Sequence, residues 1–96
     1  MPDLAMPVFN REPITSLFGV MHFPNDFEKA GILAAWKLAG ALQSASNEQV
    51  AEIGSDRIWA VQNMARGYPN IAREAEKAFY RGTQVGYLGS YLWHAW

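Results

Sequence analysis

The chain has no cysteine among its 96 residues. This absence excludes a disulfide scaffold, a cysteine-bound zinc site, an iron–sulfur cluster and thiol catalysis. An excess of charge of one sign is also missing, because 8 basic residues nearly balance 9 acidic ones and the formal net charge is −1. Without a basic excess there is no general electrostatic attraction to nucleic acid. We therefore do not expect nucleic acid as the partner.

Long apolar runs are missing as well. The longest, residues 30–42, has 13 residues and contains Lys37, whereas a membrane-spanning helix needs about 20. The first residues, MPDLAMPVFNREP, carry no basic leader before an apolar run, so they predict no signal peptide. We expect a soluble protein and, by default, a cytoplasmic location.

Motifs of catalysis and cofactor binding are scarce. The two histidines, His22 and His94, are 72 positions apart, and neither has a carboxylate or a second histidine at metal-ligand spacing. No serine lies in a GxSxG motif, and neither GxGxxG nor the phosphate-binding GxxxxGK[ST] occurs. The sequence therefore predicts a protein that is not an enzyme and that uses no cofactor or metal.

Half of the residues are hydrophobic, which is too many for a disordered chain, and a chain this short forms one small core. Four of the five prolines lie within residues 1–24, so this segment is not one long helix. It is nevertheless rich in apolar residues, which predicts a proline-rich apolar N-terminal arm. Apolar residues at helical spacing between positions 14 and 21 favour one short helix after Pro13. The arm either covers its own core or docks on another subunit.

Residues 25–96 are predicted to form a helical domain, so the fold is expected to be all-α, a small three-helix bundle. The first helix spans residues 25–45, with Asn25 and Glu28 at the spacing of a capping box. It is apolar on nearly all sides, which predicts burial on more than one side. Its main apolar stripe is expected to comprise Phe27, Gly31, Ala34, Leu38, Ala41, Leu42 and Ala45. So short a chain has few elements to cover both sides, and this favours a partner or self-association.

The second helix is expected after Ser46, which forms a capping box with Gln49. The segment Gly54-Ser55-Asp56 either kinks this helix or splits it, since glycine favours breaks. Gly67 followed by Pro69 is a typical helix stop.

A third helix, capped by Asn70, is predicted to run nearly to the end of the chain. Its glycines at positions 82, 86 and 89 each cost about 1 kcal/mol relative to alanine. Close packing of Gly82 and Gly86 against another helix offsets this cost. The alternative is a loop over residues 82–90.

Two charged ladders lie on the second and third helices. The acidic one is Glu48, Glu52 and Asp56, and the basic one is Arg73, Lys77 and Arg81. Folding the two helices back on each other places only Asp56 near Arg81. The other charges remain free to orient a partner.

Aromatic residues form the most prominent predicted surface. On a continuous third helix, Tyr80, Tyr87, Tyr91 and His94 fall within about 60° of each other, opposite the glycines. Tyrosine and tryptophan dominate interface hot spots because they desolvate a large rigid area. The predicted partner-binding residues are Tyr80, Tyr87, Tyr91, Trp93, His94, Trp96, Trp36 and Trp59.

These patterns predict a non-catalytic helical protein–protein interaction module. It would be an accessory or assembly subunit, or a small inhibitor, that docks on a larger complex or self-associates through its aromatic face. The alternative is a small helix-turn-helix-like DNA-binding protein, because residues 50–67 read as an apolar helix, a glycine turn and a second helix ending in arginine. A peripheral membrane contact of the aromatic C-terminus is a third, weaker hypothesis, since no basic residue follows Arg81.

Overall fold

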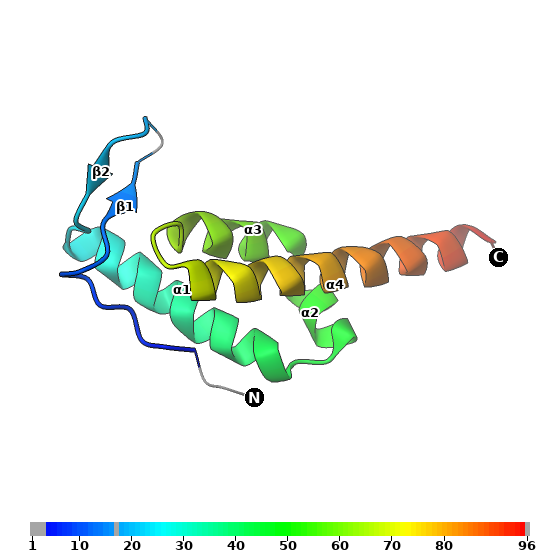
Figure 1. The fold of residues 1–96 in the computed structure, drawn as a ribbon. Coiled ribbons are helices and arrows are strands. Elements are labelled where there is room, and N and C mark those ends of the chain that lie inside the picture. Colours follow the sequence, from blue (N-terminus) through cyan, green and yellow to red (C-terminus); the bar gives the residue numbers. More distant parts are fainter. Residues whose placement is uncertain (1–3, 17, 96) are drawn as a thin grey trace.

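The computed structural model describes residues 4–16 and 18–95, and the side chains of these residues as far as Gly86. Two short strands, β1 (Ile14–Thr15) and β2 (Met21–His22), precede four helices. The helices are α1 (Asp26–Ser44), α2 (Asn47–Ile53), α3 (Ser55–Met64) and α4 (Pro69–Ala95). Figure 1 shows α4 running along the other helices and extending beyond them at its C-terminal end. The predicted small all-α bundle is confirmed.

Both predicted capping boxes are present. The Asn25 side chain accepts from the backbone N–H of Glu28 at 2.8 Å, while the Glu28 carboxylate accepts from the N–H of Asn25 at 3.0 Å. Ser46 and Gln49 form the same reciprocal pair at the start of α2, at 3.2 and 2.8 Å. Each box satisfies two backbone groups that would otherwise lack a partner.

Gly54 splits the second predicted helix into α2 and α3. Its φ of 89° lies in the region that favours glycine. The third helix continues without a break through residues 82–90, so the loop alternative is wrong. It begins at Pro69, one residue before the predicted cap Asn70, because proline lacks an N–H and suits the first helical position.

The core lies where α1, α2 and α3 pack on α4. The buried face of α1 comprises Ile32, Ala35, Ala39 and Leu42. Of the stripe predicted for this helix, Leu42 is buried, and Leu38 and Ala45 pack half-buried against the core. The prediction was wrong for Phe27, Ala34 and Ala41, which are exposed, Phe27 at 89%. The error has a physical origin, since a helix that is apolar on nearly all sides gives no periodic signal of which side is covered. The buried hydrophobic residues of the described chain are Ile14, Ile32, Ala35, Ala39, Leu42, Val50, Ile58, Val61, Ala65, Tyr68, Ile71, Ala75 and Ala78.

The arm contains an antiparallel β1–β2 hairpin where a short helix was predicted after Pro13. The Ser16 hydroxyl accepts from the N–H groups of Phe18 and Val20 at 3.3 and 3.2 Å, and the Ser16 N–H donates to the Val20 carbonyl at 2.9 Å. Gly19 supplies the φ of 80° in the turn. A serine that bonds the nearby backbone competes with helix formation, and here this outweighs the helical spacing.

The described part of the arm before the hairpin packs on its own bundle. The Trp36 indole N–H donates to the Leu4 carbonyl at 3.1 Å. The Tyr68 hydroxyl donates to the Glu12 carbonyl at 3.4 Å, and the Phe9 ring lies edge-on to Tyr68 at 6.0 Å. Of the two roles predicted for the arm, these residues take the first and cover their own core.

Candidate functional site

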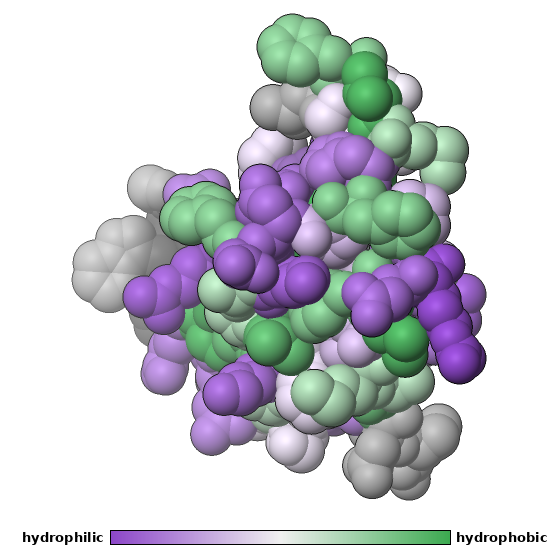
Figure 2. All heavy atoms as spheres, turned by 90° about the vertical axis from the view of Figure 1, so that its left-hand side faces the viewer, coloured by the Kyte–Doolittle hydropathy of each residue, from purple (hydrophilic) through white to green (hydrophobic). Residues whose placement is uncertain are grey.

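The hairpin end of the molecule exposes large apolar side chains. Phe18 is 94% exposed at the tip of the hairpin, and Phe27 lies in the first turns of α1. Figure 2 views this end and shows apolar side chains gathered on the hairpin, with further apolar and polar groups interspersed below it. We call the following set the apolar end surface: Phe18, Val20, Met21, Phe23, Phe27 and Met64.

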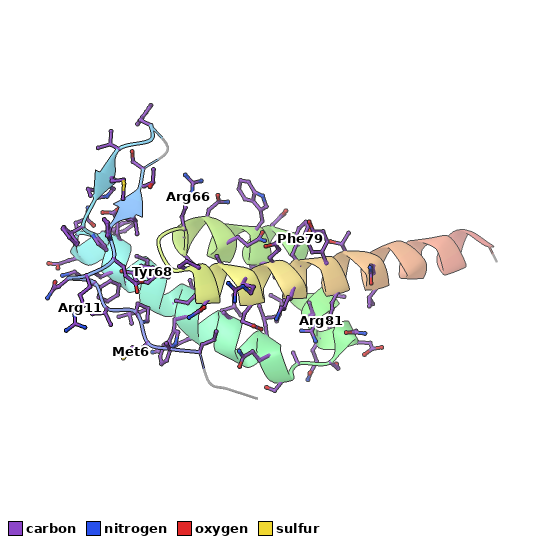
Figure 3. All side chains as sticks on the ribbon, in the orientation of Figure 1. Met6, Arg11, Arg66, Tyr68, Phe79 and Arg81 are labelled. Atoms are coloured by element: carbon purple, nitrogen blue, oxygen red, sulfur yellow. The ribbon has the colours of Figure 1, made fainter. Side chains whose placement is uncertain are left out.

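A groove of about 390 Å³ opens on this surface, between β1, the first half of α1 and the end of α3. Ile14 and Ile32 line it together with Phe27 and Met64. Met64 is 50% exposed and Phe27 more so, so the apolar walls themselves face solvent and the groove is shallow. Arg66, which follows α3, is exposed at the edge of the groove and donates to Asn63 at 3.0 Å (Figure 3).

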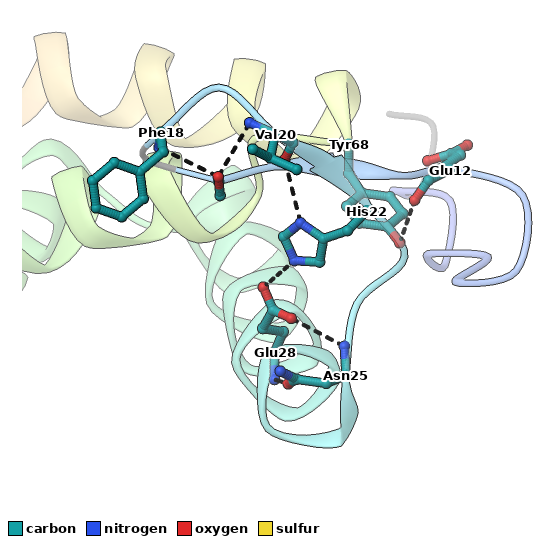
Figure 4. Close-up of polar contacts among 8 residues, drawn as sticks. Glu12, Phe18, Val20, His22, Asn25, Glu28 and Tyr68 are labelled. Carbon is teal, nitrogen blue, oxygen red and sulfur yellow. Dashed lines mark hydrogen bonds and ion pairs between the residues drawn. The ribbon is translucent and has the colours of Figure 1, made fainter.

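His22 connects the hairpin to the start of α1. Its Nε2 lies 2.9 Å from a carboxylate oxygen of Glu28, and its Nδ1 lies 3.3 Å from the Val20 carbonyl oxygen (Figure 4). The other carboxylate oxygen of Glu28 accepts from Asn25 in the capping box. One carboxylate therefore caps α1 and binds the imidazole of the hairpin at the same time.

These contacts shift the pKa values of His22 and Glu28 in the directions that favour an ion pair. The hydrogen bond to Glu28, and then the one to the Val20 carbonyl, raises the pKa of His22 above its ordinary 6.5. The backbone N–H of Asn25, and then His22, lowers the pKa of Glu28 below its ordinary 4.5. His22 and Glu28 are not at metal-ligand spacing in the sequence, so the sequence patterns did not predict this contact. The available signal was the capping box, which fixes the Glu28 carboxylate just after β2.

The predicted partner-binding residues divide into two groups. The side chains of Tyr87, Tyr91, Trp93 and His94, and the whole of Trp96, lie outside the described residues. In the second group, Trp59 on α3 is 61% exposed and Tyr80 on α4 is 58% exposed. Trp36 is half-buried and engaged with the arm. The aromatic face predicted on the third helix thus has one described member, Tyr80.

Arg81 does not pair with Asp56, and that prediction was wrong. Its guanidinium donates to the carbonyl oxygens of Leu42 and Ala45 at 2.8 and 3.3 Å. The last turn of α1 contains no basic residue, and a cation there satisfies free carbonyls and complements the helix dipole. Arg81 is therefore a structural cap for α1, supplied by α4.

The helix-turn-helix alternative finds no support in the connection between α2 and α3. Gly54 alone separates these helices, whereas the motif uses a turn of three to four residues. Arg66 at the end of the segment is engaged with Asn63, whose amide in turn donates to the Trp59 carbonyl at 3.0 Å.

Within the described residues, no group of three or more histidine, aspartate or glutamate side chains converges as a metal site. No helix in this part of the chain is long and apolar enough to cross a membrane. Comparison with known proteins found no matching family, curated protein or solved structure.

Proposed function

We propose that the protein is a non-catalytic interaction module that docks on a larger partner protein through the apolar end surface. The observation that carries this proposal is the exposure of two phenylalanines, Phe18 and Phe27, at 94% and 89%, beside an apolar groove. Withdrawing one such side chain from water is worth about 1.5–3 kcal/mol. Two of them, with Met64 beside the groove, are enough to act as interface anchors.

The shape of the groove favours a protein segment over a small molecule. Small-molecule sites bury most of their ligand, whereas Phe27 and Met64 form outward-facing walls. The side of an amphipathic helix fits such a shallow apolar groove between helices. Arg66 at its edge has further N–H donors besides the one used by Asn63. We propose an amphipathic partner helix that carries a carboxylate toward Arg66.

The aromatic face predicted on the third helix is a second contact in this proposal. Its members are Tyr80, with Tyr87, Tyr91, Trp93, His94 and Trp96 beyond it in the sequence. In the role of accessory subunit or inhibitor, it would form a contact on α4 separate from the apolar end surface. Exposed Trp59 on α3 is a further candidate.

The test compares substitutions at the two surfaces against a purified partner. Binding is measured by isothermal titration calorimetry for wild type, Phe27→Ala and Phe18→Ala, and Tyr80→Ala probes the second contact on α4. Because hot-spot truncations cost about 2 kcal/mol or more, we expect each phenylalanine variant to weaken binding at least about thirtyfold. All variants should keep the wild-type melting temperature, since the replaced side chains are exposed.

Wild-type affinity in both phenylalanine variants would refute docking at the apolar end surface. A loss of binding in Tyr80→Ala alone would move the interface to the aromatic face. Sedimentation velocity of the isolated chain tests self-association. A dimer that Phe27→Ala dissociates would make the partner a second copy of this chain.

A further inference from the structure

We propose that protonation of His22 holds the hairpin against α1 and so makes the shape of the docking groove depend on pH. This inference concerns the regulation of the proposed docking site and rests on the proposed function. It is carried by the positions of two hydrogen-bond acceptors around one imidazole ring.

Both ring nitrogens of His22 face acceptors. The Glu28 carboxylate lies at Nε2 and the Val20 carbonyl at Nδ1, at 2.9 and 3.3 Å. A neutral imidazole has one N–H and one lone pair, so it satisfies one acceptor and turns a lone pair toward the other. The imidazolium has two N–H donors and satisfies both. The observed arrangement is therefore complete only when His22 is charged.

The contact joins opposite walls of the groove. Ile14, Thr15 and Ser16 of the hairpin form one wall, and Glu28 belongs to the other. Across residues 14–16 and 18–23, the His22–Glu28 contact is the single hydrogen bond from the hairpin to a helix. The remaining attachment is apolar, through the buried Ile14. Losing the charge on His22 leaves one N–H for the two acceptors and removes the charge-assisted bond to Glu28. This weakens the hold on the hairpin wall while the helices stay in place.

Of the titratable groups around the hairpin, His22 is the one that changes its charge between pH 5 and 8. On α1, Glu28 is the charge that acts on it, while Lys29 lies 4.0 Å from Asp26. After α3, Arg66 is bound to Asn63. At the start of α4, burial and then the nearby Glu12 raise the pKa of Tyr68 above its ordinary 10.0, so this phenol stays neutral. Among the residues whose side chains the structure describes, only His22 has an ordinary pKa between 5 and 8.

The charges of His22 and Glu28 set the direction of the pH dependence. The hairpin is held while His22 is protonated and Glu28 is ionised, and it loosens as the pH rises through the pKa of His22. A partner that needs the hairpin wall therefore binds more tightly at pH 5.5 than at pH 8. The chain has a second histidine, His94, near the C-terminal end of α4, and this end of α4 lies at the opposite end of the molecule from the hairpin (Figure 1).

Glu28→Gln is the decisive variant because it keeps the helix cap. Glutamine caps α2 from the equivalent position, where Gln49 accepts from Ser46 at 2.8 Å. With its oxygen on Asn25, the new amide turns an N–H toward Nε2 of His22. That donor favours the neutral ring and reverses the preference of the wild type.

The experiment is a pH titration of the full chain by NMR, with His94→Gln as background and no partner added. We expect the ring of His22 to titrate with a midpoint above 6.5, and the methyl resonances of Ile14 and Met64 across the groove to shift with the same midpoint. In Glu28→Gln the midpoint should fall below that of the wild type. In His22→Gln the groove resonances should lose this pH response.

Groove resonances that stay constant while His22 titrates would overturn the inference, as would an unchanged midpoint in Glu28→Gln. His22→Gln tests the same coupling without altering the helix cap, so the test does not depend on one variant folding. The titration needs no partner. It therefore fails or succeeds independently of the binding experiment with Phe27→Ala, which tests the proposed function.

Discussion

Two glycines on α4, one turn apart, give a matched test of helix packing. A Cβ placed on Gly82 would lie 3.0 Å from a methyl carbon of Val50 in α2. For Gly86, no described atom beyond its chain neighbours and the adjoining backbone of α4 lies within 4 Å of that position. Close packing was predicted at both glycines, and the structure confirms it at Gly82 only. We therefore expect Gly82→Leu and Gly86→Leu to change stability in opposite directions.

The magnitudes follow from two effects. Replacing glycine by leucine inside a helix gains about 0.8 kcal/mol in either variant. Forcing a larger side chain into a packed interface costs about 1–3 kcal/mol, and Val50 is fully buried and stiff at χ1. Gly86→Leu should therefore stabilise by about 0.8 kcal/mol, and Gly82→Leu should be about 1–3 kcal/mol less stable than Gly86→Leu. The helical gain cancels in this difference, which isolates the contact with Val50.

Thermal and urea unfolding monitored by circular dichroism measure the difference. For a domain of this size, 1 kcal/mol corresponds to about 4–8 °C in melting temperature, so we expect the two variants to melt roughly 5–20 °C apart. Equal melting temperatures would refute the contact between α2 and α4 at Val50. A loss of stability in Gly86→Leu would show that another element covers that position.

Three further predictions concern the arm, the cap of α1 and pH. Gly67→Ala places a Cβ 2.6 Å from a methyl carbon of Ile14, so it should destabilise the protein by about 1–3 kcal/mol in urea unfolding. Wild-type stability would mean that the arm does not pack against Gly67 at Ile14. Arg81→Met removes two charged hydrogen bonds to the end of α1 and should lower the free energy of unfolding by about 1.5–3 kcal/mol. The control Lys77→Met, at an exposed ion pair, should change it by less than about 1 kcal/mol. Equal losses in the two variants would argue against the cap. Because the pKa of His22 is raised in the folded protein, the ion pair contributes its full stability below pH 6.5 and loses it as the pH rises through that raised pKa. Because the pKa of its carboxylate partner is lowered, that contribution is full above pH 4.5 and is lost as the pH falls through the lowered pKa. Unfolding at pH 3, 5.5 and 8 should therefore separate His22→Gln from wild type most at pH 5.5, and a constant difference would contradict the pairing.

Local signals in the sequence predicted the parts of this fold that depend on neighbouring residues. The capping boxes at Asn25 and Ser46 each involve residues three positions apart. The stop predicted at Gly67 and Pro69 is less accurate, because α3 ends at Met64 with Ala65 as its C-cap, and Gly67 is not among the glycines with positive φ. The break at Gly54 was one of two alternatives, and the structure decides for the split. Such features need little tertiary information, since they satisfy backbone groups at the ends of their own helices.

The features that sequence patterns missed depend on contacts between distant elements. The partner predicted for Arg81 assumed a straight second helix packed along the third. The break at Gly54 invalidates that alignment, and the carbonyls of Leu42 and Ala45 at the end of α1 bind the guanidinium instead. The exposed position of Phe27 was missed because nothing in the sequence of α1 marks which apolar side the bundle covers. The His22–Glu28 contact depends on a hairpin, whereas a short helix was favoured between positions 14 and 21, so the sequence patterns gave no reason to bring His22 to the start of α1.

Gly54 also governs how the domain unfolds. It joins two helices of 7 and 10 residues, each too short to persist alone in water. Both pack on α4, and neither has another partner of comparable extent. Once α4 separates, these two helices unfold as well, so we expect the bundle to melt in a single all-or-none step.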